Sequence, residues 1–574
     1  MKKYATGRHQ HIGVEERFYI SAPPSSPACS TSGLCSPGIR KCLNGRRNGV
    51  ESLATEAVEE GAVSTQADLI SDRGPKDLGR RTVPGGALLF SDTAKLVLAR
   101  GLSTAIGFVT GPVIARLFSP TDFGLAGIVN SIGAWIGAFA CLAYAQAIPL
   151  STSRRETRAL ILLCLLVTSV LLVPVVLIPL VGGAIISRIM AEPALKPLLW
   201  FLPMTFLLSS FTQVAHYTCS REGRFGLLSF SGFAGGSIGR ALEIGLGLLL
   251  GGSALYILSA SLAAGLATLL ICTPLILQVL LRSPSGTASE DAAVTRVAKR
   301  HGQFPTIQVW NSVLNQASYS LPVLIVAVCF GLRVVGYYSM GLNVIMLPMT
   351  ILAGSLAQVF YPQAARDWSQ KGEVSGAIHT TIRIISLTCV FPLAIVGLLG
   401  PLLFSVFFGS RWHEAGIFSQ ILAPWVLARL VASPISTMFL VRRRAGMLMT
   451  FNAVWLVGGS GALLLAGRVA GPRVGLMCFS AVGLLAYVWL AAMALRLGGA
   501  PWRPVTAELL QESLYSFGLL LPASIAYWAG GPVVLCIALA LAGTVAYAAR
   551  AYRRGIAIRH ELRDMVRATV GARP

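Results

Sequence analysis

Long apolar segments constrain this chain more than any other feature. From about Asp92 onward the sequence passes repeatedly through apolar segments of about 20 residues, the length of an α-helix that crosses a bilayer. Apolar residues make up 54% of the 574 residues and charged residues 12%, whereas soluble proteins have about 25% charged residues. So little charge cannot cover the water-facing surface of a chain this long. The sequence therefore predicts an all-α polytopic membrane protein and excludes a soluble multidomain enzyme.

The apolar segments fall into a group of twelve and a later group of two. The twelve are expected near 93–115, 124–147, 159–182, 197–218, 227–250, 254–281, 306–331, 334–361, 381–408, 417–440, 449–467 and 474–496. Two more, near 513–529 and 532–549, are predicted to form a C-terminal hairpin over Gly530-Gly531-Pro532. The pattern therefore predicts about 14 transmembrane helices.

Basic residues predict the orientation of these spans. The formal net charge is +23, and Lys and Arg residues gather in the short loops between spans. One set of alternate loops carries 17 of them and the opposite set carries 7. Because basic loops stay in the cytoplasm, both termini are predicted to be cytoplasmic. The basic surplus is explained in this way, and we expect no nucleic-acid partner.

A spacing pattern recurs in the two halves of the chain. Three residues with spacings of 6 and 22 recur with the same spacings, as Phe118, Gly124 and Gln146 and again as Phe330, Gly336 and Gln358. This repeat predicts two parallel six-helix units, an architecture in which transporters place the substrate site between the units. The expected parts are an N-terminal extension (1–90), a first six-helix lobe (91–300), a second six-helix lobe (301–505), the hairpin (506–550) and a basic cytoplasmic tail (551–574).

Residues 1–90 differ from the rest of the chain. They are rich in Ser, Pro, Gly and charged residues, and such a composition cannot bury enough apolar surface to fold. We expect either a disordered cytoplasmic extension or upstream sequence that a start codon assigned too early has added.

Acidic residues and metal-binding patterns are scarce. Beyond position 92 there are 14 Asp and Glu residues, and Glu243 is the one carboxylate well inside a span. The external loops are expected to be short. The sequence has neither a GxxxxGK[ST] phosphate loop nor a Cys-x-x-Cys or His cluster of the kind that binds zinc. We therefore expect no enzyme activity, no cofactor and no metal site.

Two arginines within spans are candidates for a substrate cavity, because charge inside a membrane is expensive and usually functional. Arg100 lies in the first span, in a stretch rich in Gly, Ser and Thr. The alternative for Arg100 is a side chain that extends to the cytoplasmic interface. Arg429 lies midway along the tenth span, where Pro424 and Pro434 are expected to free backbone groups beside it.

Carboxamide side chains form a second set of candidates. In span seven three of them share one helical stripe, namely Gln308, Asn311 and Asn315. Asn130 in span two and Asn343 in span eight hold near-equivalent places in the repeat. Such amides either line a wet path and hydrogen-bond sugar hydroxyls, or join helices through interhelical hydrogen bonds.

Other polar residues in the spans are interpreted as structural. Arg240 and Glu243 are spaced i, i+3 on one helical face, which favours a neutralising ion pair over a substrate site. Gln146 and Gln358, which are equivalent in the repeat, sit at expected helix ends and are predicted to fix helix packing.

Four stretches carry a resemblance to a known family. RLFSPTDFGLAGI (116–128) resembles the junction of the first two helices in polysaccharide-biosynthesis flippases of the multidrug/oligosaccharidyl-lipid/polysaccharide exporter superfamily. Further stretches of this style are FPTIQVWNSVLNQASYSLPVLIVAVCFG (304–331), VVGYYSMGLNVIMLPMTILAGSLAQVFYP (334–362) and LLGPLLFSVFFGSRWHEAGIFSQILAPWVLARLVASPISTMFLV (398–441). The resemblance covers about residues 91–500.

This resemblance implies a carrier that moves undecaprenyl-diphosphate-linked oligosaccharides across the bacterial inner membrane. It implies two six-helix lobes around a cationic cavity, alternating access without ATP hydrolysis, and a role in O-antigen, capsule or exopolysaccharide synthesis. The implied partners are the lipid-linked substrate, membrane lipids, and polysaccharide polymerase and chain-length proteins. Two alternatives remain within the superfamily. A cation-coupled multidrug exporter is expected to carry a carboxylate inside the first or seventh span, where this chain has none beyond Asp92. A lipid II flippase would differ mainly in its cavity.

Overall fold

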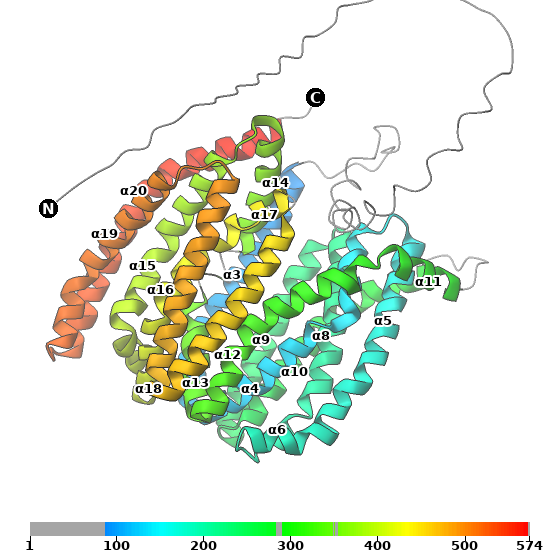
Figure 1. Ribbon diagram of the computed structural model, residues 1–574, viewed down its shortest axis with the longest axis horizontal. Helices are drawn as coiled ribbons and strands as arrows, with labels where there is room; N and C mark the ends of the chain where they lie inside the picture. Colours follow the sequence, from blue (N-terminus) through cyan, green and yellow to red (C-terminus); the bar gives the residue numbers. More distant parts are fainter. Residues whose placement is uncertain (1–85, 283–289, 348, 350–353, 443, 572–574) are drawn as a thin grey trace, which may run out of the picture. The chain divides into compact units, whose positions relative to one another are not determined.

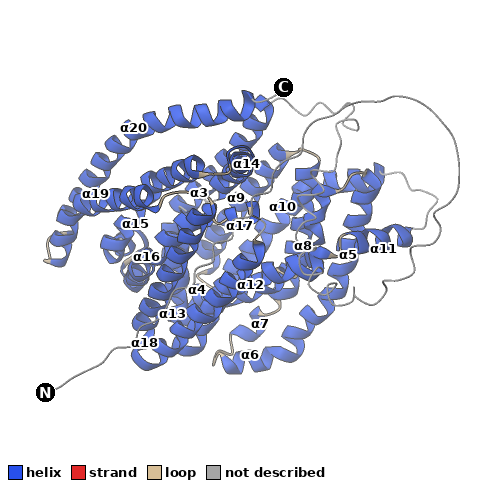
Figure 2. Cartoon of the chain, turned by 45° about the horizontal axis from the view of Figure 1, so that its top comes forward, coloured by secondary structure: helices blue, strands red, loops and turns tan. Residues whose placement is uncertain are grey.

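A computed structural model describes residues 86–571 apart from 283–289, 348, 350–353 and 443. All of these residues belong to one of the two units into which contacts divide the chain, Val63–Pro574. The expected extension 1–90 lies outside the described residues except for its last five positions. The described residues form helices and no strand (Figure 2). The predicted all-α fold is confirmed.

The helices follow the expected spans in order (Figure 1). The first group is α3 (Gly86–Leu117), α4 (Pro120–Gly137), η1 (Ala140–Leu150), α5 (Arg154–Leu177), η2 (Ile178–Gly182), α6 (Gly183–Ile189), α7 (Leu195–Leu198), α8 (Phe201–Arg221), α9 (Phe225–Leu250) and α10 (Ala254–Arg282). The second group is α11 (Glu290–Arg300), η3 (Phe304–Gln308), α12 (Val309–Phe330), α13 (Leu332–Ile345), α14 (Gly354–Lys371), α15 (Ser375–Phe408), η5 (Ser410–Trp412), α16 (His413–Ile435), α17 (Met438–Val441) and α18 (Ala445–Leu497). The expected hairpin is α19 (Trp502–Trp528) and α20 (Val533–Gly571).

Within the described residues, each of the fourteen expected segments coincides with helix over most of its length, although several boundaries differ. Within the described residues, nine helices are long and apolar enough to cross a membrane, and the bent pair α3 and α4 makes a tenth if it forms one span. α18 contains the expected eleventh and twelfth spans and breaks at Gly471, where φ is +88°. Within the expected span 124–147, α4 stops at Gly137. Within the expected span 334–361, α13 ends at Ile345 and α14 begins at Gly354, with 348 and 350–353 outside the described residues.

Residues of the stretch 116–128 cap the start of α4. Ser119 caps the helix, since its Oγ accepts a hydrogen bond from the Asp122 backbone N–H and its own N–H donates to the Asp122 carboxylate at 2.9 Å. Pro120 follows at the first helical position, where its fixed φ favours a helix start. The other oxygen of Asp122 accepts from the Ala254 N–H at 3.2 Å, which ties α4 to the start of α10.

The sequence repeat becomes a reciprocal crossing of α4 and α13. Gly124 and Gly336 hold equivalent places in the repeat, as do Pro120 and Leu332. A Cβ atom on Gly124 would lie 2.1 Å from the Leu332 carbonyl oxygen, and a Cβ on Gly336 would lie 1.8 Å from the Pro120 carbonyl oxygen. Each helix therefore crosses the other at an equivalent glycine, as expected if a local two-fold axis relates the repeats.

The remaining helices pack around this crossing. α9 packs between α3 and α10, and α10 packs on α8. In the later part of the chain α16 packs against α15 and α18, and α18 packs against α12. The hairpin lies against α15, where the Tyr547 and Phe391 rings stack at 4.2 Å and the Tyr547 hydroxyl donates to the Leu387 carbonyl at 2.9 Å. The lobe limits 91–300 and 301–505 stay a prediction.

Candidate functional site

A polar cavity of about 470 Å³ lies among α4, η1, α8 and α12; we call it the amide cavity. Five carboxamides and three hydroxyls line it together with small Gly and Ala residues. These polar residues are Asn130, Gln146, Gln213, Asn315, Gln316, Thr205, Ser209 and Ser312. None of the described residues that line it carries a charge. Its volume falls within the range of about 300–1,000 Å³ typical of ligand pockets.

Two amides of this cavity are exposed although they lie on membrane-spanning elements, and the other three are half-buried. Asn130 on α4 and Asn315 on α12 are both exposed. Gln213 on α8 donates weakly to the Gly137 carbonyl at 3.5 Å, and Gln316 donates to the Ser320 hydroxyl at 3.3 Å. Polar side chains at membrane depth face a bundle interior or a water-filled cavity because lipid cannot hydrogen-bond them.

An irregular backbone segment forms one wall of the amide cavity. After Gly137 the α4 helix gives way to η1, in which Cys141, Leu142 and Ala143 have φ values of +53°, +45° and +59°. These left-handed conformations cost of order 1–3 kcal/mol per residue and are typical of functional sites. Burial of Cys141 and Ala143 in the surrounding helices holds them in place. Interrupted membrane helices beside a cavity are where transporters build substrate sites.

The predicted carboxamides separate into three groups. Asn130 and Asn315, which belong to the first and second expected lobes, come together in the amide cavity. Asn343 lines a second cavity. Gln308 and Asn311 belong to the same stripe as Asn315 but line neither cavity.

Sequence reasoning missed several residues of the amide cavity. Gln146 is predicted to fix helix packing, yet it lines the amide cavity, because α4 ends at Gly137 and η1 then packs against α8 and η3. Gln213 and Ser312 were not singled out. The available signal was a carboxamide within an apolar span, which all of these amides share.

The second cavity has a volume of about 450 Å³ and lies among α3, α4, α9, α13 and α15; we call it the arginine cavity. Arg240 is the charged residue in its described lining, which also contains Ser103, Thr104, Asn343 and three phenylalanines. Arg240 Nη1 lies 2.9 Å from Glu243 Oε2, so the expected i, i+3 ion pair is present.

The two other predicted arginines differ in placement. Arg429 is 3% exposed, with its guanidinium carbon 4.0 Å from the Tyr319 ring centre, 5.7 Å from Trp425 and 5.9 Å from Tyr487. It thereby joins α12, α16 and α18 by cation–π contacts and lines neither of these two cavities. The cavity role expected of Arg429 stays a prediction. Arg100 lies on α3, and its side chain is outside the part that the structure describes.

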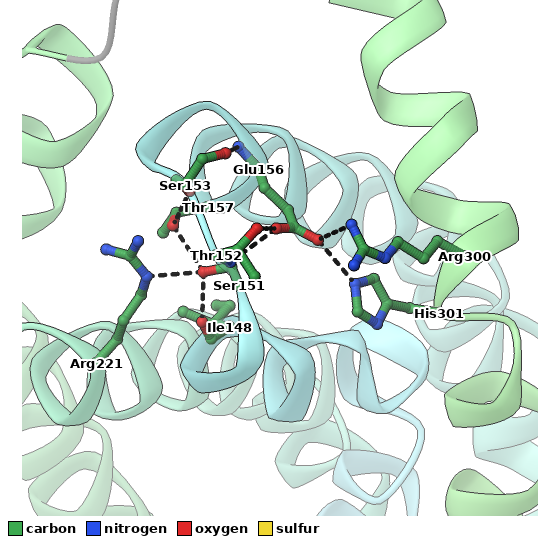
Figure 3. Close-up of polar contacts among 9 residues, drawn as sticks. All are labelled: Ile148, Ser151, Thr152, Ser153, Glu156, Thr157, Arg221, Arg300 and His301. Carbon is green, nitrogen blue, oxygen red and sulfur yellow. Dashed lines mark hydrogen bonds and ion pairs between the residues drawn. The ribbon is translucent and has the colours of Figure 1, made fainter. Parts of the chain in front are cut away.

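A polar network fixes the far end of η1 to the segment before α12 (Figure 3). The Glu156 carboxylate accepts from the Thr152 N–H at 2.8 Å and from the Thr152 hydroxyl at 2.9 Å. It also lies 3.3 Å from both Arg300 and His301, at the end of the helix α11. The Ser151 hydroxyl accepts from Arg221 Nε at 2.7 Å. α11 is thereby docked on the start of α5.

The end of α3 is capped by η5, which lies much later in the chain. The last carbonyls of a helix lack intrahelical partners. Trp412 Nε1 donates to the Ala115 carbonyl at 2.8 Å, and the Arg411 guanidinium donates to the Arg116 carbonyl. The Trp412 ring also contacts Phe123 edge-on at 5.2 Å. This junction, which we call the tryptophan clasp, joins the expected first and second lobes.

The fold is that of lipid flippases and multidrug transporters. A structure of the lipid II flippase MurJ in an inward closed conformation aligns with 82% of this chain and 100% of its own, with a TM-score of 0.60 and 13% identity. An inward-facing multidrug resistance MATE family transporter of the MOP superfamily aligns with 72% of this chain and 98% of its own, with a TM-score of 0.51 and 14% identity. The protein is thus a multi-pass membrane protein with a transporter fold.

The sequence assigns the family within this fold. Residues 113–416, more than half of the chain, match the family described as polysaccharide biosynthesis protein. The chain therefore belongs to the polysaccharide biosynthesis protein family, and the resemblance inferred from its motifs is confirmed. The lipopolysaccharide biosynthesis protein WzxC of Escherichia coli (strain K12) is 24% identical over 166 residues, which are 28% of this chain and 33% of WzxC. The match thus spans a third of that relative.

Proposed function

We propose that the protein translocates lipid-linked oligosaccharides across the bacterial cytoplasmic membrane by alternating access, with both termini in the cytoplasm. The observation that carries the proposal is the amide cavity: a hollow among membrane-spanning helices, lined by five carboxamides and three hydroxyls and by no charged residue within its described lining. The family of the chain, polysaccharide biosynthesis protein, supports the same substrate class.

The chemistry of this lining suits sugars. A carboxamide offers two N–H donors and a carbonyl acceptor, and a hydroxyl both donates and accepts. A sugar hydroxyl also donates and accepts, so amides on several helices can follow a ring of hydroxyls without charge. A cationic drug would instead require a carboxylate, and none lines the amide cavity in the described residues. The uncharged lining therefore favours the oligosaccharide over the exporter alternative.

Translocation requires the cavity to face each side of the membrane in turn. The α4–α13 crossing gives the two repeats a common contact at Gly124 and Gly336. The tryptophan clasp closes one end of the same boundary, between α3 and η5. We propose that opening the clasp releases the head group on the outer face while the lipid tail stays in the bilayer.

A genetic test measures the proposed activity directly. Cells that lack the gene are expected to lose surface polysaccharide and to accumulate lipid-linked oligosaccharide on the cytoplasmic leaflet. The double variant Asn130→Ala/Asn315→Ala should fail to restore surface polysaccharide. A matched control is Gln511→Ala, which removes an exposed carboxamide on the hairpin helix α19 and should restore it fully. Normal polysaccharide in the deletion strain, or a gain of drug sensitivity without a polysaccharide defect, would refute the proposal.

A further inference from the structure

Arg429 is a buried charge that the described residues do not neutralise. It lies midway along α16 and is 3% exposed. Three aromatic rings surround its guanidinium, and among the described residues no carboxylate pairs with it and no hydrogen bond reaches it. We call Arg429 and these rings, Tyr319, Trp425 and Tyr487, the aromatic cage. Buried charges in proteins are normally paired, so ring faces alone are an incomplete set of partners.

The helices that form the aromatic cage supply no counter-charge within reach of Arg429. α12 and α18 contain no Asp or Glu, and neither do α13 and α15, which also pack against α16. α16 itself carries Glu414, fifteen residues before Arg429, which is about 22 Å along a helix. Glu414 pairs instead with Arg473. The negative charge that balances Arg429 must therefore come from outside these helices.

Cation–π contacts do not replace that negative charge. The closest ring is Tyr319, whose centre lies 4.0 Å from the guanidinium carbon. A ring face attracts a cation through its quadrupole, but it offers no lone pair to the five N–H donors of a guanidinium. Taking a charged group out of water is also costly unless an opposite charge and hydrogen bonds repay it. The aromatic cage thus lacks both an acceptor and an anion.

A second unpartnered donor lies beside Arg429. Nε1 of Trp425 is buried and has no hydrogen-bond partner among the described residues. Trp425 and Arg429 are one turn apart on one face of α16, and the guanidinium carbon lies 5.7 Å from the indole ring centre. The indole also lies close to the α18 backbone, since a Cβ on Gly483 would be 2.8 Å from Nε1. An indole N–H can only donate, so it needs the same kind of occupant as Arg429.

We propose that the aromatic cage binds one small monovalent anion of the size of chloride, which accepts hydrogen bonds from the Arg429 guanidinium and the Trp425 indole N–H. Charge favours an anion over a water molecule, because water accepts a hydrogen bond without neutralising a cation. Burial favours a small anion, since Arg429 and Trp425 are each 3% exposed and a lipid-linked head group cannot enter. The bound anion stabilises the junction of α12, α16 and α18. This inference goes beyond the proposed function and does not depend on it.

Thermal melting of the purified full-length protein in detergent tests this site. Sodium chloride is exchanged for sodium gluconate at constant ionic strength, because gluconate is too large for the aromatic cage. Chloride should raise the melting temperature by a few degrees and in a saturable way, since a ligand that binds only the folded state stabilises it. Bromide should act in the same way. In crystals grown with bromide, its anomalous signal should lie between Arg429 and Nε1 of Trp425.

Three variants assign the effect to the aromatic cage. Arg429→Met should abolish the chloride dependence of the melting temperature, whatever that temperature is. Trp425→Phe keeps a ring but removes the N–H, and should weaken the apparent chloride affinity several-fold. The matched control is Arg442→Met, because the Arg442 guanidinium carbon also lies 4.0 Å from a ring centre, that of Trp368, but Arg442 is only half-buried. This control should keep the chloride dependence of the wild type.

Three results would overturn the inference. They are a wild-type melting temperature that does not respond to chloride, an equal response in Arg429→Met, and a bromide signal elsewhere with none at the aromatic cage. If Arg429→Met does not fold, the chloride titration of Trp425→Phe and the bromide position decide the question. None of these measurements involves surface polysaccharide, so a failure of the proposed function would leave this inference standing, and the reverse also holds.

Discussion

Replacing Trp412 with phenylalanine removes one hydrogen bond from the tryptophan clasp while an aromatic ring stays in place. The lost bond is the one from the indole N–H to the Ala115 carbonyl, 2.8 Å long and fully buried. Ala115 lies in the last turn of α3, so its carbonyl has no intrahelical partner to return to. The variant therefore leaves a buried acceptor unpaired whenever the clasp is closed.

The size of the effect follows from that unpaired acceptor. Leaving a buried carbonyl without a partner costs about 1–3 kcal/mol. If water hydrogen-bonds the Ala115 carbonyl when the clasp is open, the substitution raises the free energy of the closed state only. The equilibrium between closed and open clasp should then shift toward open by roughly 5- to 150-fold.

Distance measurements between α3 and α18 detect this shift. Val113 on α3 is 44% exposed and Val474 on α18 is 37% exposed, so both accept a spin label. The Arg473–Glu414 ion pair joins α18 to α16, and Trp412 directly precedes α16. A label at Val474 therefore follows the position of Trp412 relative to α3. Labels introduced as unnatural amino acids spare the native cysteines. Double electron–electron resonance should show a longer distance gaining population in Trp412→Phe.

Trp200 supplies a matched control for this experiment. It directly precedes α8 and holds the place in the first repeat that Trp412, directly before α16, holds in the second, but it is 49% exposed. Trp200→Phe should therefore leave the distance distribution unchanged. Identical distributions for Trp412→Phe and the wild type would refute the idea that this hydrogen bond holds the closed state.

Three further predictions follow from the cavity, the crossing and the polar network. Asn315→Ala should reduce surface polysaccharide in a complementation assay more than Asn311→Ala, one turn away on α12, because Asn315 lines the amide cavity and Asn311 does not; equal losses would contradict the assignment. Gly336→Val should abolish stable expression, since even a Cβ there would lie 1.8 Å from a backbone oxygen of α4, whereas Gly226→Ala on α9 meets open space and should leave the melting temperature unchanged or raise it slightly, because Ala favours a helix over Gly; a stable, well-expressed Gly336→Val protein would be inconsistent with the crossing. Glu156→Gln weakens the pairing with the end of α11 and should speed amide hydrogen exchange in Glu290–Arg300, with the amides of α12 as internal reference; unchanged exchange in α11 would show that other contacts hold it.

The spans could be predicted from the sequence because their cause is local. Lipid demands apolar side chains and internal backbone hydrogen bonds, so the described residues of the expected segments are mostly helical. The Arg240–Glu243 pair was equally local, since residues three apart on a helix are neighbours whatever surrounds them. The family was visible for a related reason: the cap of α4 at Ser119 and the crossing glycine Gly124 leave recognisable residue types in the chain.

The candidate site depended on contacts between distant elements. The apolar sequence of η1 does not indicate that α4 stops at Gly137. The left-handed residues that follow are stabilised by the helices packed around them, and these come from distant parts of the chain. That stop places Gln146 in a cavity wall. The surroundings of Arg429 could not be predicted from the sequence either, because the rings that contact it come from α12 and α18 as well as from its own helix.

By itself the sequence determined that this chain spans a membrane as helices, carries an internal repeat and belongs with polysaccharide biosynthesis proteins, because hydropathy, spacing and capping act over a few neighbouring residues. Tertiary structure alone decided which amides line the amide cavity, which arginine lines the arginine cavity, and where the tryptophan clasp caps α3. Those outcomes depend on how helices far apart in the chain approach one another, and the linear order of residues does not record that approach.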